Sequence, residues 1–315
     1  MNKGRKIIID TDIGDDIDDA IALYAAMRQK FEIVGITTVF NNTEQRARMV
    51  KKLLLEYGNG YGNVPVYAGF GTPIAKDSCN RSDIPHYTSD LEQEIYAPDG
   101  KVPEDAIDFI IDACYRYGKD LTVVAIGPFT NLARVIERDT EALNRIEKVV
   151  IMGGAYFKQY ADWNVLCDVE AADVMFRGVD RLECIGADVT HLTVAEDALY
   201  DTLLAYKGSE PARLYLCKLC NMWRRICPHA DFVMHDPLVI YYLADSTICT
   251  VQEASVAVIK EGYARALTLN VDAYGKKSYH PDEYRNFDGD HKALVASGVD
   301  LDVFNMRILR DFLEF

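Results

Sequence analysis

Short apolar runs that alternate with helix-like segments constrain the fold of this chain more than any other feature of its sequence. Residues 6–10, 33–39, 121–127 and 149–154 read KIIID, IVGITTV, LTVVAIG and VVIMGG. Unbroken runs of this kind are typical of strands that are buried on both faces, as in a parallel sheet covered by helices on each side. The pattern therefore predicts an α/β fold with an open, mostly parallel sheet and helices on both faces.

Helical patterns fall between these runs. Residues 43–58 open with a Thr-Glu-Gln cap and close on glycine, as helices often do. Residues 103–118 repeat apolar side chains along one helical face. No internal repeat, low-complexity segment or linker interrupts the pattern, so we expect a single domain over residues 1–315. The least regular stretches, 70–100 and 270–292, are expected to be long surface loops.

The net charge and the distribution of cysteines restrict which partners the protein can bind and which cellular compartment it is expected in. The net charge of −15 argues against nucleic acid and against an anionic membrane surface as partners. No signal peptide or apolar stretch of membrane-spanning length is present, so we expect a cytoplasmic protein whose scattered cysteines are reduced and buried. Cys217 and Cys220 have C-x-x-C spacing but lack a second cysteine pair, and we interpret them as one face of a helix.

Six aspartates crowd into ten positions at the junction between the first apolar run and the next helix. They are Asp10, Asp12, Asp15, Asp16, Asp18 and Asp19. At ~4 Å, with an effective dielectric constant near ~20, each pair of carboxylates costs about 4 kcal/mol. A bound cation, raised pKa values or exposure to solvent would relieve the repulsion, but exposure explains Asp10 and Asp12 poorly. An all-carboxylate site favours Ca²⁺ or Mg²⁺ over zinc.

Polar residues also follow the other predicted strands. They include Asn41 and Asn42, the segment GPFTN at 127–131, the segment GGAY at 153–156, and Asp188. Ligands of open parallel sheets bind beyond the carboxyl ends of the strands. The sequence therefore predicts a site at this edge of the sheet.

Two other interpretations fit the acidic segment less well. An EF-hand loop needs glycine at its sixth position and glutamate at its twelfth. Counted from Asp10, this sequence has Asp15 and Ile21 at those positions. A haloacid-dehalogenase-type phosphatase also begins with a strand and Asp-x-Asp, but it normally carries Thr or Val where Gly14 stands. Such an enzyme also needs a later lysine and an acidic pair. These have no convincing counterpart here, and the phosphatase remains an alternative.

The segment DTDIGDDIDDAIAL, residues 10–23, resembles the N-terminal signature of the inosine–uridine-preferring nucleoside hydrolase family. Further segments are similar to the motifs of that family in the same order: residues 35–42, 62–69, 125–133, 149–172, 186–191 and 234–238. The resemblance implies Ca²⁺-dependent hydrolysis of the N-glycosidic bond of a small-molecule ribonucleoside through an oxocarbenium-like transition state.

The resemblance also implies a metal site. Asp12 would be both a Ca²⁺ ligand and the base that deprotonates the attacking water. Asp19, Asp236 and the backbone carbonyl of Ile126 would be further ligands. Asp10 would be buried behind the metal ligands and would orient them without touching the substrate.

Substrate contacts follow from the same resemblance. The ribose would contact Asp18, Asn42, Asp162 and Asn164. His235 would protonate or hydrogen-bond the leaving base, or else be a structural histidine. Trp163 would offer a stacking face or belong to the core, and His86 would lie in a loop that closes on substrate.

The sequence departs from the family pattern in ways that leave alternatives open. Asp15 and Asp16 have no counterparts, and we interpret them as ordinary acids at an inserted helix start. The Gly-Asn-x-Thr-Pro insert of the family, which supplies an asparagine to the ribose, is absent. A ribose- or nucleoside-binding protein of the same fold with little catalytic activity is therefore the competing hypothesis. Family members are commonly dimers or tetramers, so we expect a homodimer or homotetramer.

Overall fold

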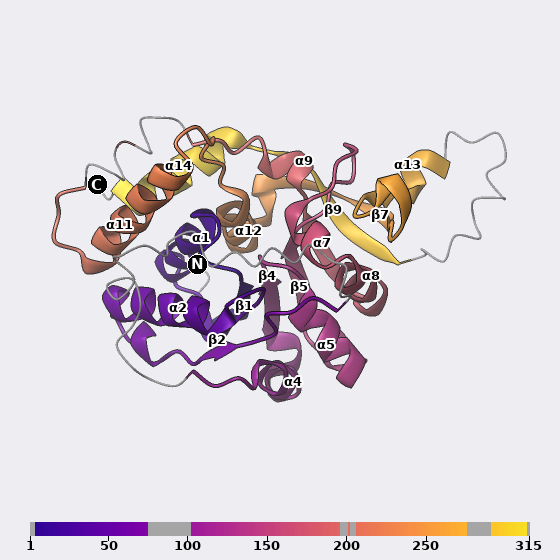
Figure 1. The fold of residues 1–315 in the computed structure, drawn as a ribbon, viewed down its shortest axis with the longest axis horizontal. Helices are drawn as coiled ribbons and strands as arrows, with labels where there is room; N and C mark the ends of the chain where they lie inside the picture. Colours follow the sequence, from indigo (N-terminus) through magenta and orange to yellow (C-terminus); the bar gives the residue numbers. More distant parts are fainter. Residues whose placement is uncertain (1–3, 75–101, 196–200, 202–205, 276–290, 314–315) are drawn as a thin grey trace.

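A nine-stranded, mostly parallel sheet forms the centre of the described part of the chain (Figure 1). The computed structural model describes residues 4–74, 102–195, 201, 206–275 and 291–313. The strands are β1 (Lys6–Thr11), β2 (Glu32–Thr38), β3 (Val66–Ala68), β4 (Leu121–Ala125), β5 (Lys148–Met152), β6 (Leu182–Ile185), β7 (Cys249–Val258), β8 (Thr268–Asn270) and β9 (Lys292–Val299). Their order is β3-β2-β1-β4-β5-β6-β9-β7-β8. Neighbours are parallel from β3 to β9, whereas β7 is antiparallel to both β9 and β8.

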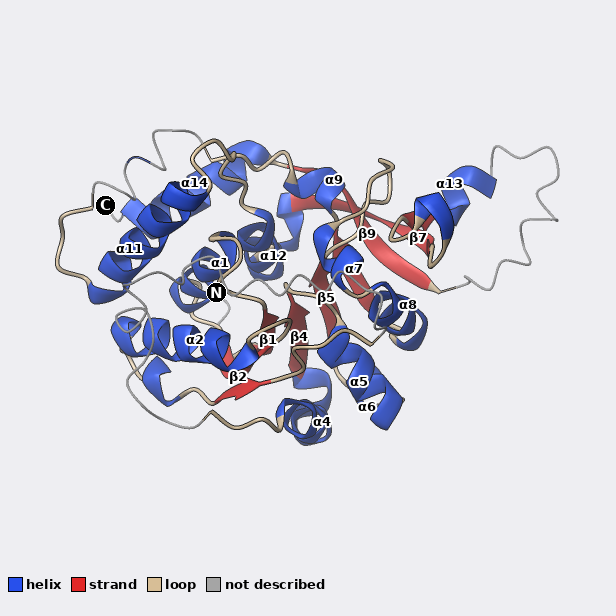
Figure 2. Cartoon of the chain, viewed as in Figure 1, coloured by secondary structure: helices blue, strands red, loops and turns tan. Residues whose placement is uncertain are grey.

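Helices cover both faces of this sheet (Figure 2). They are α1 (Asp18–Arg28), α2 (Thr43–Tyr57), α4 (Ala106–Tyr117), α5 (Thr130–Arg138), α6 (Ala142–Arg145), α7 (Trp163–Cys167), α8 (Val169–Gly178), α9 (Ala187–Thr190), α11 (Pro211–Ile226), α12 (His235–Ala244), α13 (Val271–Gly275) and α14 (Leu301–Leu313). Ile7 and Ile9 of β1 pack into a core with α1, α2, α11, α12 and α14, while Ile8 points into a second core with α4, α5 and α8. This alternation explains why β1 is apolar at consecutive positions. The predicted fold class is confirmed.

The acidic segment folds differently from the prediction in one respect. Asp15 and Asp16 lie in the turn that precedes α1, and the helix begins only at Asp18. Gly14 takes a φ of 119° in this turn, a conformation that favours glycine. Ile17, beside the acids, is fully buried. The apolar anchor holds the segment as a turn, which corrects the expectation of an inserted helix start.

Two smaller expectations also change. Helix α2 is capped by Asn42, whose side chain accepts a hydrogen bond from the Gln45 amide at 3.2 Å, rather than by the Thr-Glu-Gln segment. The stretch predicted as a loop over residues 270–292 begins with a short helix, α13, packed against β7. Most of both predicted loops lies outside the described residues. Across the described helices, none is long and apolar enough to cross a membrane.

Candidate functional site

A pocket of about 430 Å³ opens where β1, β4 and β5 end. The first turns of α1, α7 and α12 contribute to its wall, so segments from the two halves of the chain meet there. The predicted site residues that line it are Asp12, Asp18, Asp19, Ile126, Asp162, Trp163, Asn164, His235 and Asp236. The structure therefore brings together most of the residues that the sequence analysis singled out.

Three buried carboxylates form the most compact group in this wall. One oxygen from each of Asp18, Asp19 and Asp236 lies within 4.8 Å of the other two. The Asp236 amide donates to Asp18 Oδ2 at 3.1 Å, which links the first turn of α12 to that of α1. Thr11 at the end of β1 donates to Asp19. Asp18, which the sequence analysis assigned to the ribose, is thus a member of the group, whereas Asp12 lines the pocket beside it.

Burial makes the charged forms of these acids unfavourable. Desolvation and the neighbouring carboxylates hold the pKa values of Asp18, Asp19 and Asp236 well above the ordinary range. Burial raises the pKa of Asp12 to about 8, although the Arg46 guanidinium favours its anion. Carboxylate oxygens at this spacing are the ligands that a hard divalent cation prefers, and such a cation would favour their charged forms. The group therefore fits a metal ion of the Ca²⁺ or Mg²⁺ type.

The Asp12 carboxylate sits against the loop that follows β4. A Cβ atom added to Gly127 would lie 2.8 Å from Asp12 Oδ1 and 2.9 Å from the Asp12 amide nitrogen. The glycine of the GPFTN segment therefore leaves the space that Asp12 occupies.

Asp10 lies behind this wall rather than in it. Its Oδ1 accepts hydrogen bonds from Thr37 of β2 and, at 2.7 Å, from Asn131 of α5, while Oδ2 is buried without a described partner. Burial raises the pKa of Asp10 to about 7. The residue ties together the ends of β1, β2 and α5 and so supports the loop that carries Asp12.

The start of α7 supplies three further predicted residues. Asp162 caps the helix by accepting from the Val165 amide at 3.3 Å, and burial raises its pKa to about 6. Asn164 Nδ2 donates to the carbonyl oxygens of Ile126 at 3.0 Å and Met152 at 3.1 Å. Asn164 thereby holds the ends of β4 and β5 together. It is also a partner of the carbonyl that the sequence analysis assigned to the metal.

Trp163 is 38% exposed, so it belongs to the rim of the pocket and not to the core. Its ring meets Phe40 edge to face, with centroids 6.4 Å apart. An exposed indole at the rim can offer its face to a planar ligand.

A histidine pair forms another part of the wall. His235 Nδ1 is 2.6 Å from the Thr190 hydroxyl, and its ring meets that of His191 edge to face with centroids 5.0 Å apart. The Tyr160 ring also packs against that of His191, with centroids 5.4 Å apart. Burial, together with His191, lowers the pKa of His235 to about 4, so its ring is neutral at neutral pH.

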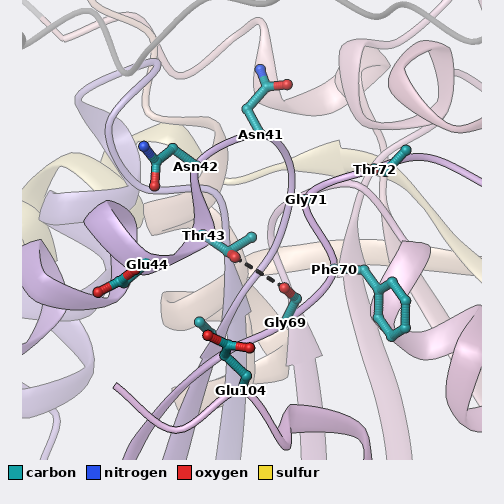
Figure 3. Close-up of a pocket in the computed structure, with 10 residues that line it drawn as sticks. Asn41, Asn42, Thr43, Glu44, Gly69, Phe70, Gly71, Thr72 and Glu104 are labelled. Atoms are coloured by element: carbon teal, nitrogen blue, oxygen red, sulfur yellow. Dashed lines mark hydrogen bonds between the residues drawn. The ribbon is translucent and has the colours of Figure 1, made fainter. Parts of the chain in front are cut away.

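Not every predicted residue lies in this pocket. Asn42 lines a neighbouring pocket of about 730 Å³ at the ends of β2 and β3, with Asn41, Glu44 and Glu104 (Figure 3). There the Thr43 hydroxyl donates to the Gly69 carbonyl at 2.9 Å. A ribose contact of Asn42 stays a prediction. His86 lies outside the described residues.

The sequence analysis missed His191, Tyr160 and Arg46. His191 ends the GADVTH segment, where it was the one titratable side chain following the strand-end aspartate. Arg46 lies four and seven residues before the buried Val50 and Leu53, on the same face of α2. A charge on an apolar stripe was therefore the signal that could have marked Arg46 as buried.

The chain is similar in sequence to known nucleoside hydrolases. Residues 7–306 match the model of the inosine-uridine preferring nucleoside hydrolase family. The chain is 30% identical over 317 residues to the inosine-uridine preferring nucleoside hydrolase of Leishmania major, with 95% of each chain covered. It is 30% identical over 282 residues to uridine nucleosidase 1 of Arabidopsis thaliana, covering 85% of this chain and 82% of that one.

The fold is similar to solved structures over nearly its full length. The purine-preferring ribonucleoside hydrolase from Gardnerella vaginalis superposes with a TM-score of 0.78, at 28% identity and with 98% of each chain covered. A plant nucleoside hydrolase superposes with a TM-score of 0.82 at 24% identity, covering 99% of this chain and 100% of the other. The chain therefore belongs to the inosine-uridine preferring nucleoside hydrolase family and is a nucleoside hydrolase.

Proposed function

We propose that this enzyme hydrolyses the N-glycosidic bond of ribonucleosides to free base and ribose with the help of Ca²⁺. The observation that supports the proposal most is the trio Asp18, Asp19 and Asp236, buried in the wall of a pocket at the carboxyl ends of the strands. Asp12 and Ile126 line the same pocket, and we assign the Asp12 carboxylate and the Ile126 carbonyl oxygen as the remaining ligands. A bound cation would lower the pKa of a neighbouring water and offset part of the carboxylate charge.

Asp12 is the proposed base. Its carboxylate takes a proton from the attacking water, and its position is set by Gly127 on one side and by the turn that follows β1 on the other. A cation bound beside Asp12 would favour its deprotonated carboxylate, which is the form that accepts a proton from water. Asp10 supports this loop from behind.

Cleavage of the glycosidic bond builds positive charge on the ribose ring. The Asp162 carboxylate stabilises that charge, because its position is set before reaction by the Val165 amide. Asn164 is likewise held in place by two strand-end carbonyls and orients a ribose hydroxyl. Groups that are already oriented stabilise the transition state without the cost of reorganisation.

The leaving base lies along the aromatic side of the pocket. His235 is neutral. We assign the tautomer in which Nδ1 accepts from the Thr190 hydroxyl, so that Nε2 donates a hydrogen bond to the base. Trp163 offers a stacking surface at the rim, and His191 forms the adjoining wall.

Release of free ribose from a panel of nucleosides tests the proposal. The panel contains uridine, cytidine, inosine, adenosine and guanosine, because the relatives named above include a uridine nucleosidase and a purine-preferring hydrolase. We expect ribose release with Ca²⁺, loss of release after chelation, and recovery when Ca²⁺ is returned. Full turnover in the chelated protein would contradict the role of the metal.

Assembly and location complete the proposal. We infer a homodimer or homotetramer in the cytoplasm, which light scattering on the purified protein and fractionation of cells would test. A monomer at micromolar concentration would contradict the proposed assembly.

A further inference from the structure

Arg46 is a fully buried cation. Its side chain contacts the turn at residues 12–15, which precedes α1, and the loop after β2. Its Nε donates to the Phe40 carbonyl at 2.7 Å, and its Nη1 donates to the carbonyl oxygens of Ile13, at 3.0 Å, and Asp12. Its Nη2 pairs with Asp15 Oδ2 at 2.8 Å. The Arg46 side chain has no exposed surface, whereas that of Asp15 is 16% exposed.

The Arg46 guanidinium acts as a clamp, because its contacts hold several parts of the turn in a fixed arrangement. Arg46 Nη1 binds the carbonyl oxygens of two consecutive peptide groups, those of Asp12 and Ile13. The Asp15 carboxylate binds Nη2 of the same guanidinium. A planar fork with several fixed donors can do this, whereas a lysine ammonium on a flexible stem cannot reproduce it. The turn is also where the sequence carries the two acids that have no counterpart in the family signature.

We propose that Arg46 and Asp15 are positioning residues that fix the place of the Asp12 carboxylate. They thereby preorganise the proposed metal ligands, which also include the trio Asp18, Asp19 and Asp236. The inference rests on the proposed function, because it concerns Ca²⁺ binding and hydrolysis at that site. Neither residue is proposed as a metal ligand. Asp15 acts through its ion pair with Arg46.

The sign of one effect separates positioning from simple electrostatics. A positive charge near the site opposes the approach of a cation, so a purely electrostatic role predicts that loss of the Arg46 charge tightens Ca²⁺ binding. A positioning role predicts the opposite, because ligands that are no longer held in place bind more weakly.

Calorimetric titration of the metal-free protein with Ca²⁺ provides the test. We expect Arg46→Lys, which keeps the charge but loses the fork, and Arg46→Met, which loses both, each to weaken Ca²⁺ binding about tenfold. Asp15→Asn keeps an acceptor for Nη2 and should weaken it less, by about threefold. Arg48→Met, an arginine two residues further along α2, is the matched control and should bind Ca²⁺ as the wild type does.

A second measurement separates positioning from a general loss of structure. At saturating Ca²⁺, kcat of Arg46→Lys should remain about tenfold low while KM for the nucleoside changes less than about twofold, since a misplaced base slows chemistry more than binding. If the Arg46 variants do not fold, Asp15→Glu decides the outcome, because it keeps the negative charge but displaces the carboxylate from Nη2. Wild-type Ca²⁺ affinity and kcat in Asp15→Glu would overturn the clamp.

The possible failures can be told apart. Wild-type affinity for Ca²⁺ in Arg46→Lys and Asp15→Asn, or tighter binding in Arg46→Met, would overturn the clamp and leave the proposed function intact. Wild-type protein that binds Ca²⁺ but releases no ribose would overturn the proposed function, while the calorimetry still decides the clamp. A wild-type protein that binds no Ca²⁺ overturns both.

Discussion

Asp236 reaches the pocket from the first turn of α12, while Asp18 and Asp19 reach it from the first turn of α1. Backbone amides at a helix N-terminus favour negative charge, and here two such termini converge on one group of acids. Burial nevertheless raises the pKa of each carboxyl, so the metal-free site keeps charge only at a cost in stability. A bound cation would offset the cost of charging these buried carboxylates.

Replacement of one trio member tests that view. Asp236→Asn removes a carboxylate oxygen, so kcat/KM should fall by more than about a hundredfold, and the rise in unfolding temperature on adding Ca²⁺ should disappear. Without metal, the unfolding temperature should be unchanged or higher, because one buried acid has left a like-charged group. Scanning calorimetry with and without Ca²⁺ measures both. Asp302→Asn, an exposed acid in the first turn of α14, is the control.

His235 permits a prediction about leaving-group chemistry. His235→Ala should lower kcat about a hundredfold on a natural nucleoside, because the departing base loses its hydrogen-bond donor. On 4-nitrophenyl riboside, whose leaving group needs no proton, the loss should be less than about tenfold.

The exposed His291, directly before β9, offers the control variant, His291→Ala, which should leave both rates unchanged. Equal losses on the two substrates in His235→Ala would instead assign that histidine a structural role.

Among elements, the loops after β1 and β4 depend on each other. β1 and β4 are adjacent and parallel, so the residues that follow them leave the sheet side by side. Gly127 then faces Asp12 at a distance that leaves no room for a Cβ atom. The site is therefore assembled by strand pairing and by the smallest side chain at one contact.

Gly127→Ala should disturb this contact. The added methyl group should lower the free energy of unfolding by about 1–3 kcal/mol and weaken Ca²⁺ binding, since Asp12 has to move. Urea denaturation and calorimetric titration measure the two effects. Gly298→Ala in β9 is the control, because the nearest atoms to its added Cβ lie 3.9 Å away, and it should change stability by less than about 0.5 kcal/mol. Wild-type stability in Gly127→Ala would contradict the close packing.

For the whole molecule, the buried acids link stability to pH and to metal. The folded-state pKa is about 7 for Asp10 and about 8 for Asp12, both above the ordinary value of 3.8. In the folded chain these two acids therefore keep protons that the unfolded chain has lost, and their contribution to stability falls as pH rises through that window. His235, whose pKa is lowered from 6.5 to about 4, contributes in the opposite direction only below its ordinary value.

Unfolding of the metal-free protein at pH 5.5, 6.5 and 8 measures this dependence. We expect the free energy of unfolding to fall by at least about 1 kcal/mol per pH unit. Saturating Ca²⁺ should reduce or reverse the slope, because a cation favours the charged carboxylates. Metal-free protein that becomes more stable toward pH 8 would contradict the burial of these acids.

The fold and much of the pocket could be predicted from local patterns. Apolar runs such as residues 6–10 and 149–154 became β1 and β5, because strands buried on both faces leave a continuous signature in one dimension. Asp12, which follows the first strand, entered the pocket because parallel strands end at one edge of the sheet, whereas Asn164 was assigned through the resemblance to the family. The start of α1 was less well predicted, since an apolar anchor inside the acidic segment kept Asp15 and Asp16 in a turn.

By itself, then, the sequence determined the α/β class, the edge of the sheet that carries the site, and the family to which the chain belongs. Only the tertiary structure decided that Asp18 joins Asp19 and Asp236, because that choice depends on how two helix starts face each other across more than two hundred residues of chain. Only the tertiary structure paired Asp15 with Arg46, 31 positions away. Spacing along a chain encodes periodicity and strand ends, whereas contacts between such distant segments depend on packing in three dimensions.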